Sequence, residues 1–505
     1  MRQNQYNNRL HYPAYFDKIC SAEKAALLID NKNVVGVSGF TKAGDSKAVL
    51  PAFAARAAKE NLQITLISGA SLGYNIDGLL AKNKALIKRM PFQMDKELRD
   101  SINSGKVLYI DQHLSQTAEF LAKKQLPPVD IAIIEASKID KNGYIVPTTS
   151  VGNSTTLAKM ANKIIIEINT FFPDNLESIF DIYSPPETNE PRPIDITTPE
   201  SKIGNNFIPL DPQKVMAIVF TNHPDEPANV KEPDQKPFRI ADHLLNFLKS
   251  EVKKDRLPIQ LKPIQVGIGK IANAVLSRFM ESSFADLTMY SEVLQDSTFE
   301  LMDAGKLSYA SATSITLSKD CRTKFFKNFD QYKDKIILRP QNISNSPEVI
   351  RRLEIISINT AIEIDIYGNV NSSHIGGNKI MNGIGGSGDF ARNALLSIFV
   401  CPSTSKNHTL SHIVPMVTHV DNTEHDVDII VTEVGLADLR GLAPRERATS
   451  IINNCIHPLY KKQMLQYYQE ALQHGGHTPH LLSKAFSWHI HYNEKGTMLF
   501  TNYSA

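Results

Sequence analysis

The 505-residue sequence lacks the cysteine pattern of several large protein classes. Its four cysteines, Cys20, Cys321, Cys401 and Cys455, lie far apart and form no CxxC pair. The pattern therefore indicates neither a disulfide framework nor a thiolate zinc site, and a reduced, intracellular protein is expected.

Long apolar runs and an excess of charge are also missing. No run of 18 apolar residues occurs, and the segment from Met1 to Ile19 lacks the apolar core of a signal peptide. We expect a soluble, cytoplasmic protein without a membrane partner; Arg2 and Arg9 leave a mitochondrial presequence as the alternative. The formal net charge is +2, from 55 Lys+Arg and 53 Asp+Glu, so no global charge favours nucleic acid.

Several enzyme signatures are absent as well. No GxSxG segment exists, which disfavours a serine α/β-hydrolase, and no Gly-Lys-Ser/Thr follows a glycine-rich run, which excludes a Walker A loop. Five of the 15 histidines fall in the last 32 residues, but no HExxH or Cys/His ligand spacing accompanies them. We therefore expect no metal site.

The sequence does contain short β-branched strands that alternate with helical stretches. Ser21 is a predicted N-cap, and a longer helix is predicted over 47–59. The strands predicted in the first third lie at 34–38, 62–68, 107–110, 131–136 and 164–168. This alternation predicts βαβ units around a mainly parallel sheet.

A proline-rich segment separates this region from a second one like it. Residues 184–236 hold ten prolines and few apolar runs, which is typical of an inter-domain crossover. Beyond it the pattern predicts strands at 263–267, 287–293 and 362–366 and a helix over 271–280. It also predicts a helix start at Ser346-Pro347, where the serine side-chain oxygen can accept a hydrogen bond from an orphan amide. We predict two α/β domains, 1–215 and 216–505.

Glycine gathers in one place. Six of the 25 glycines lie between residues 376 and 388, and the run from Gly383 to Asp389 is followed by a predicted helix. Such a loop leaves backbone amides free to meet an anion or a developing oxyanion. A simple bend between packed elements is an equal alternative.

A second glycine pair, Gly267 and Gly269, follows an apolar strand. In open α/β sheets ligands bind beyond the carboxyl ends of strands, so this loop is a candidate for a nucleotide-like group. A tight turn between strand and helix is at least as good an interpretation.

Glu292 is the carboxylate that stands out, because apolar and aromatic residues flank it near the end of a predicted buried strand. A carboxylate held beside an electrophilic carbonyl can act as a covalent nucleophile. The alternative, favoured on pattern alone, is an exposed or salt-bridged glutamate.

Longer motifs in one order resemble the class I CoA-transferases of the acetyl-CoA hydrolase/transferase group. That group includes succinyl-CoA:acetate and propionyl-CoA:succinate CoA-transferases and proteins named acetyl-CoA hydrolase. The motifs are Val37-Ser38-Gly39-Phe40-Thr41, Arg89-Met90-Pro91-Phe92-Gln93, Tyr109 to Ser115, Tyr290-Ser291-Glu292, Met381 to Phe390, and Glu433 with Ala437-Asp438-Leu439-Arg440-Gly441.

The resemblance implies two tandem open α/β domains of the NagB/RpiA-like CoA-transferase fold, with the active site between them. It implies that Glu292 attacks an acyl-CoA thioester and later carries CoA as a glutamyl thioester, that Gly386 lies at the oxyanion hole, and that Glu433 has a supporting role. The CoA contacts that it implies are Gln265, Val266, Gly267, Ile268, Gly269, Asn382, Gly386 and Lys406. CoA enters as a substrate, no cofactor is tightly bound, and a homodimer is expected.

One position departs from the family pattern. Succinyl-CoA:acetate members carry an arginine near the segment equivalent to Thr221-Asn222, where it can approach the glutamate matching Glu433, whereas this chain has Asp225-Glu226. The leading hypothesis is transfer of CoA between a short acyl-CoA, succinyl-CoA or acetyl-CoA, and a carboxylate such as acetate. Net acetyl-CoA hydrolysis, propionyl-CoA:succinate transfer and a non-catalytic CoA-binding protein are the alternatives.

Overall fold

The computed structural model describes residues 8–185, 192–228 and 235–500. Contacts divide the chain into two compact units that interleave along the sequence. The first holds Met1–Asn229, Met289–Phe299 and Tyr309–Leu353, and the second holds Val230–Thr288, Glu300–Ser308 and Glu354–Ala505. Parts of the predicted crossover, 186–191 and 229–234, lie outside the described residues. The predicted division into 1–215 and 216–505 stays a prediction.

The first unit contains a seven-stranded sheet in the order β4-β3-β2-β1-β5-β8-β9, and all of its strand pairs are parallel. Its strands are β1 (Val34–Val37), β2 (Ile64–Ile67), β3 (Leu86–Met90), β4 (Leu108–Tyr109), β5 (Ile131–Ala136), β8 (Lys163–Asn169) and β9 (Val215–Thr221). The strand order reverses between β1 and β5, which is where parallel sheets usually bind ligands, beyond the carboxyl ends of the strands. The predicted parallel α/β architecture is confirmed.

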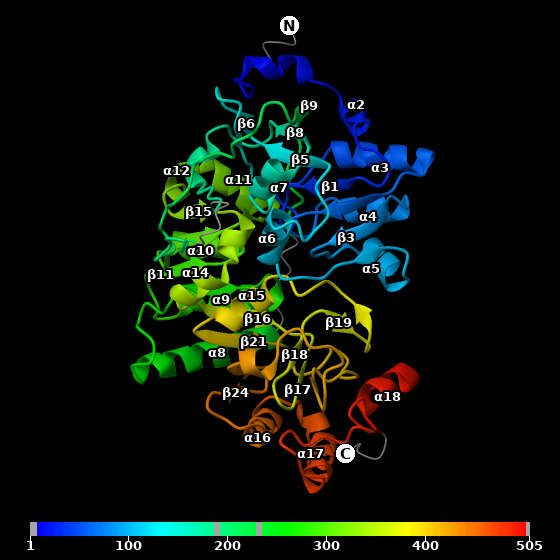
Figure 1. The fold of residues 1–505 in the computed structure, drawn as a ribbon. Helices are drawn as coiled ribbons and strands as arrows, with labels where there is room; N and C mark the ends of the chain where they lie inside the picture. Colours follow the sequence, from blue (N-terminus) through cyan, green and yellow to red (C-terminus); the bar gives the residue numbers. More distant parts are fainter. Residues whose placement is uncertain (1–7, 186–191, 229–234, 501–505) are drawn as a thin grey trace. The chain divides into compact units, whose positions relative to one another are not determined.

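Helices join these strands as the sequence predicts. They are α2 (Ala22–Ala26), α3 (Val49–Glu60), α4 (Ile76–Lys82), α5 (Lys96–Asn103), α6 (Gln116–Ala122) and α7 (Ser154–Met160). Ser21 caps α2, since its side chain accepts a hydrogen bond from the Lys24 amide. In Figure 1, α3, α4 and α5 follow one another along one flank of this unit, and residues such as Val35, Phe53 and Leu66 fill its core.

The later segments of the first unit carry shorter elements. They are β12 (Val293–Leu294), β14 (Ser314–Ile315), β15 (Ile336–Leu338), α11 (Lys319–Lys327), α12 (Phe329–Tyr332), α13 (Gln341–Ser344) and α14 (Pro347–Arg352). Three elements, β11 (Leu287–Tyr290), α10 (Asp296–Asp303) and β13 (Leu307–Ala312), run through residues of both units. β12 pairs with β14, and the end of β13 pairs with β15, both in parallel.

One detail of the predicted helix start at Ser346 is wrong. Pro347 is the first residue of α14, but the Ser346 side chain makes no capping hydrogen bond. The Ile350 amide instead donates to the Ser346 carbonyl at 2.9 Å, and Pro347 has no N–H to satisfy. Backbone bonding therefore begins this helix.

The second unit has a parallel core of β10 (Ile264–Val266), β16 (Ile356–Thr360), β21 (Leu396–Val400) and β23 (Ile429–Val431), with β24 (Leu436–Asp438) antiparallel to β23. β17 (Glu363–Asp365) pairs with β18 (Val370–Asn371) and β22 (Ile413–Val414), and β19 (His374–Ile375) forms a hairpin with β20 (Lys379–Ile380). The helices are α8 (Gln235–Lys253), α9 (Lys270–Glu281), α15 (Ser387–Asn393), α16 (Pro444–Asn454), α17 (Pro458–Gln473) and α18 (Ser487–Lys495).

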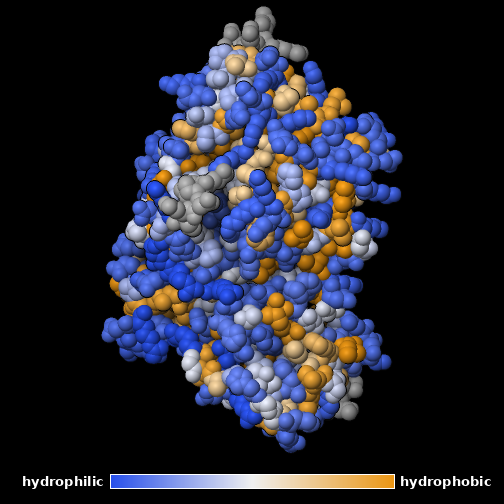
Figure 2. Space-filling model, viewed as in Figure 1, coloured by the Kyte–Doolittle hydropathy of each residue, from blue (hydrophilic) through white to orange (hydrophobic). Residues whose placement is uncertain are grey.

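The surface agrees with the balanced composition. Hydrophilic residues cover much of the face that Figure 2 shows, with hydrophobic residues between them. Within the described ranges, no helix combines the length and the apolar character that crossing a bilayer requires.

Candidate active site

Glu292 lies in the two-residue link between β11 and β12, at the end of the strand predicted to present it. Its carbonyl oxygen accepts hydrogen bonds from the amides of Thr313 and Ser314, at 3.0 and 3.1 Å. These two bonds fix the backbone from which the carboxylate projects.

The Glu292 side chain is half-buried and is held by an amide. Asn345, at the C-terminal end of α13, donates from Nδ2 to Glu292 Oε1 at 2.9 Å. The next residue, Val293, belongs to a buried cluster with Phe40 and Ala70, from the loops after β1 and β2. An oriented, partly exposed carboxylate beside an apolar cluster has the properties of a nucleophile in acyl transfer.

A cavity of about 730 Å³ opens in the second unit, beyond the carboxyl end of β10. Among the residues that the structure describes, the charged ones in its lining are Lys236, Lys270 and Lys406, and none is Asp or Glu. The cavity therefore suits a large anionic ligand.

Only some of the predicted CoA contacts line this cavity. Ile268, Gly269 and Lys406 line it, whereas Gln265, Val266, Gly267, Asn382 and Gly386 are not among the lining residues. The Gln265 amide is instead buried in the sheet, where it exchanges two hydrogen bonds of 3.2 Å with Asn359. Gly269 has φ of 113°, a conformation that favours glycine, and α9 begins immediately after it.

The glycine cluster divides into two parts with different roles. Gly376 and Gly377 form the turn of the β19–β20 hairpin, with φ of 59° and 96°, so they match the simpler interpretation of a bend. Gly386 is buried and is the N-cap residue of α15, preceded by Gly385 at φ of 59°. This part presents a buried backbone turn at the start of a helix, as the sequence predicts.

Glu433 forms an ion pair that the sequence did not predict. Its carboxylate accepts from the Ser403 amide at 2.7 Å and hydroxyl at 2.9 Å, and pairs with Lys236 Nζ at 3.3 Å. Burial alone would raise the pKa of Glu433, but these partners lower it below its ordinary value. Lys236 is the second residue of the long helix α8, far from Glu433 in sequence, and nothing in the sequence pattern connects the two.

Asp225 and Glu226 are engaged within the first unit. Glu226 pairs with Lys42 Nζ at 2.5 Å, and Asp225 pairs with Lys47 Nζ at 2.9 Å. The two acidic residues, where the family resemblance implies an arginine, thus have cations of their own. The pair is unusual in the sequence, but no sequence pattern points to either lysine.

The sequence matches two domains of one protein family. Residues 1–220 match the acetyl-CoA hydrolase/transferase N-terminal domain, and residues 322–468 match the C-terminal domain of the same family. The chain belongs to the acetyl-CoA hydrolase/transferase family.

Curated relatives of this family member have different names. It is 46% identical over 485 residues to a succinyl-CoA:acetate CoA-transferase of Clostridium kluyveri, covering 95% of this chain and 90% of that protein. It is 42% identical to an acetyl-CoA hydrolase of Yarrowia lipolytica, with 97% and 98% covered. It is 41% identical to a propanoyl-CoA:succinate CoA transferase of Escherichia coli, with 95% and 98% covered.

Solved structures support the same fold for the family member. RipA from Yersinia pestis matches with a TM-score of 0.71 at 22% identity, over 90% of this chain and 98% of that one. A 4-hydroxybutyrate CoA-transferase from Porphyromonas gingivalis matches with a TM-score of 0.61 at 21% identity, over 93% and 100%. The relatives' names are CoA-transferase and acetyl-CoA hydrolase, so this member of the family is an enzyme that acts on acyl-CoA.

Proposed function

We propose that this enzyme transfers CoA between a short acyl-CoA, succinyl-CoA or acetyl-CoA, and a carboxylate such as acetate, through a glutamyl-CoA thioester on Glu292. The observation that carries the proposal is the Glu292 carboxylate itself. It is half-buried on a fixed backbone, and Asn345 orients it at 2.9 Å.

The first half of the reaction moves CoA onto the enzyme. A Glu292 oxygen attacks the thioester carbonyl, the C–S bond breaks, and CoA thiolate leaves a mixed acyl-glutamyl anhydride. The thiolate then attacks the glutamyl carbonyl and expels the first carboxylate. The product is a glutamyl-CoA thioester and a free acid anion, with no net proton transfer.

The second half reverses these steps with the acceptor carboxylate. Each attack passes through a tetrahedral oxyanion, for which we propose the backbone amide at Gly386 as a donor. One such fixed donor stabilises a transition state by about 3 to 4 kcal/mol. Coenzyme A is a substrate in this scheme, for which the lysine-lined cavity of the second unit is the proposed site, and Glu433 supports the cation Lys236 beside it.

Mass spectrometry tests the covalent step. After incubation with acyl-CoA and no acceptor, the peptide that contains Glu292 should gain the mass of CoA less water. Glu292→Gln should remove both the adduct and the exchange of labelled acetate into acetyl-CoA. Full exchange by Glu292→Gln, or turnover without any adduct, would contradict the proposal.

Hydrolysis is the second candidate, because several of the curated relatives are named acetyl-CoA hydrolase. An acceptor panel of acetate, propionate, butyrate and succinate against a water control separates the two activities. Release of free CoA at the same rate with and without acceptor favours hydrolysis. Since the glutamyl thioester is lost when water reaches it, transfer requires that water be excluded from Glu292.

The proposal also includes a homodimer and a cytoplasmic location. The first rests on the family resemblance, and the second on the few, well-separated cysteines and the absence of long apolar runs. Sedimentation velocity and cell fractionation would test them.

A further inference from the structure

A second cavity, of about 330 Å³, lies in the first unit. The loops after β1, β2 and β3 line it together with the segment after β9. Four parallel strands of one sheet thus direct their carboxyl ends toward it, which is the usual place for a ligand in this kind of sheet.

Lys42 and Glu226 form an ion pair across this cavity. Lys42 Nζ lies 2.5 Å from Glu226 Oε1, and the Tyr74 amide donates to Oε2 of the same carboxylate. A cation and a backbone N–H that converge on one carboxylate are the usual components of an anion site. Here a carboxylate of the chain itself occupies that site.

The other charged groups of the lining have partners elsewhere. Asp95 caps α5 through the Leu98 amide at 2.9 Å, Glu97 pairs with Lys82 at 3.1 Å, and Lys96 pairs with Asp100 at 3.3 Å. Within the described part of the chain, Lys42 and Glu226 are the ion pair whose two members both line the cavity.

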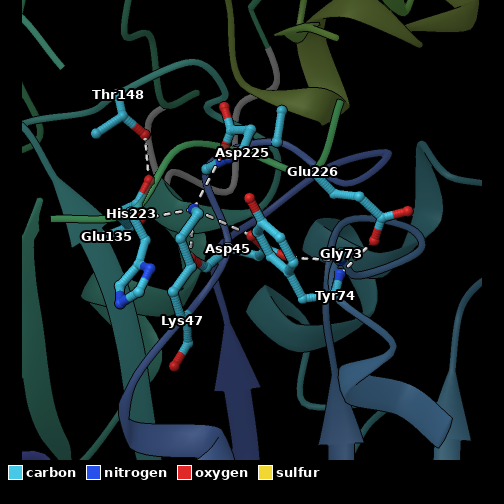
Figure 3. A network of polar contacts seen from close by, with 12 residues as sticks. Asp45, Lys47, Gly73, Tyr74, Glu135, Thr148, His223, Asp225 and Glu226 are labelled. Carbon is cyan, nitrogen blue, oxygen red and sulfur yellow. Dashed lines mark hydrogen bonds and ion pairs between the residues drawn. The ribbon is translucent and has the colours of Figure 1, made fainter. Parts of the chain in front are cut away.

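Contacts of the neighbouring Asp225 anchor the backbone beside Glu226, and Figure 3 shows one of them, the ion pair between Asp225 and Lys47. The Asp225 carboxylate pairs with Lys47 Nζ at 2.9 Å and accepts a hydrogen bond from the Gly44 amide at 3.0 Å. The Asp225 backbone carbonyl accepts a hydrogen bond from Arg322 Nη1 at 2.6 Å. Lys47 is itself buried, with a side chain only 2% exposed. The Glu226 side chain is 27% exposed, so the carboxylate can move while its backbone stays fixed.

The two loops that carry the anion site hold an unusual backbone conformation. Thr41 and Lys42 have φ of 49° and 67°, and Tyr74 and Asn75 have φ of 49° and 56°. Left-handed conformations in non-glycine residues cost free energy and are retained where the surroundings impose them, often at ligand sites. The Lys42 amide joins the two loops by donating to the Ser71 carbonyl at 3.0 Å.

The same loops contact the neighbourhood of Glu292. Phe40 and Ala70 share a buried cluster with Val293, which follows the proposed nucleophile. The Thr316 hydroxyl donates to the Thr41 carbonyl at 2.8 Å, and the Thr316 amide donates to the Leu294 carbonyl at 3.0 Å. The cavity therefore shares its supporting loops with the residue proposed to receive the acyl group.

We infer that Lys42 and the Tyr74 amide bind the distal carboxylate of a dicarboxylic acyl group such as succinyl, and that Glu226 occupies this position until the substrate displaces it. This inference rests on the proposed function. Lys42 then selects dicarboxylates over monocarboxylates of equal length, and Glu226 weakens that selection because it competes for the same cation.

Succinate and butyrate provide the test, since both have four carbons and differ in one terminal group. The full-length enzyme is assayed with each as acceptor from acetyl-CoA, and binding of each acid is measured by calorimetry. Lys42→Met should lower the succinate-to-butyrate ratio of kcat/KM on the order of tenfold, the range of a lost charged hydrogen bond. Glu226→Gln should raise the ratio by a similar factor.

Two further variants sharpen the result. The double variant Lys42→Met with Glu226→Gln should lack most of the increase in the ratio that Glu226→Gln shows alone, because that increase depends on the freed lysine. Lys96→Met is the matched control, since this lysine lines the same cavity but pairs with Asp100 at 3.3 Å, and it should leave the ratio unchanged.

The outcomes separate the inference from the proposed function. Exchange with acetate, together with ratios that stay within twofold in both single variants, overturns the inference alone. Absence of exchange with every acid overturns the proposed function, and the calorimetric ratio then still decides the inference. A ratio that rises in Lys42→Met also overturns it.

Discussion

At the scale of single residues, the hydrogen bond from Asn345 to Glu292 is the contact most directly tied to the proposed chemistry. The bond holds one carboxylate oxygen, Oε1. Because the carboxylate group is planar, the bond also defines the direction in which Oε2 points. Orientation of this kind lowers the barrier by keeping the nucleophile in a reactive geometry.

Asn345→Ala should therefore lower kcat without a matching change in KM for acyl-CoA. A hydrogen bond to a charged group contributes about 1.5 to 3 kcal/mol, which corresponds to a loss of roughly 10- to 100-fold. Steady-state kinetics measures the split between kcat and KM.

Asn142→Ala is the matched control for that variant. Asn142 bonds to Asp140 in an exposed turn, so its loss should not change either constant. An unchanged kcat in Asn345→Ala, with Glu292→Gln inactive, would show that the nucleophile needs no such orientation.

At the scale of elements, residues at or beyond the carboxyl ends of β1, β5 and β9 meet in a buried charge cluster. Lys47 Nζ lies 3.1 Å from Asp45, 2.7 Å from Glu135 and 2.9 Å from Asp225. Burial alone would lower the pKa of Lys47, but the three carboxylates raise it well above its ordinary value. One cation among three carboxylates favours a protonated carboxyl in the cluster.

Glu135 is the group that should hold this proton, and stability should fall as the pH rises. Burial, opposed by Lys47, raises the pKa of Glu135 from 4.5 to about 8. A carboxyl whose pKa is higher in the folded state stabilises the fold fully below pH 4.5, and this contribution is lost as the pH rises toward 8. One proton accounts for a slope of up to about 1.4 kcal/mol per pH unit.

Glu135→Gln should flatten that slope. Glutamine can mimic the protonated acid, accepting from Lys47 and Asn169 while its amide faces the Thr148 hydroxyl. Chemical denaturation between pH 5.5 and 8 measures the free energy of unfolding. Glu60→Gln, an exposed carboxyl on α3, is the control, and parallel slopes for wild type and Glu135→Gln would refute the assignment.

The elements themselves were largely predictable, because their signals are local. β5 has the predicted bounds, α9 extends one residue beyond its prediction at each end, and the Ser21 cap was predicted from the residues behind it. The predicted strand 287–293 instead breaks into β11 and β12 around Glu292, since Thr313 and Ser314 bond to its carbonyl from a distant segment. Hydrogen bonds between segments far apart in the chain produce no periodic pattern in the sequence.

Part of the candidate site stands out in the sequence for the same reason. Glu292 and the glycine turn at Gly386 stand out by their immediate neighbours. Three lysines form ion pairs with carboxylates that lie far away in sequence. The pairs are Lys42 with Glu226, Lys47 with Asp225 and Lys236 with Glu433. Dispersed lysines in a chain of balanced composition carry no signal by themselves.

At the scale of the whole molecule, the balanced charge limits how CoA can be attracted. A formal net charge of +2 over 505 residues produces little long-range field. We therefore expect the attraction to come from local groups such as Lys236, Lys270 and Lys406, which line one cavity of the second unit. Local attraction by exposed groups is screened within about 8 to 10 Å at moderate ionic strength.

Lys406→Met should raise KM for acyl-CoA by about fivefold at low salt, as expected when an exposed charge loses one anionic partner. Its kcat should change little, because the lysine is placed at the ligand and not at the Glu292 carboxylate. Added salt should raise KM of the wild type more steeply than that of the variant, since one screened attraction is already gone. Lys254→Met, an exposed lysine beyond the end of α8, is the control and should follow the wild type. Identical salt dependence in Lys406→Met and wild type would show that CoA does not bind against this lysine, and the lysine-lined cavity would lose its role.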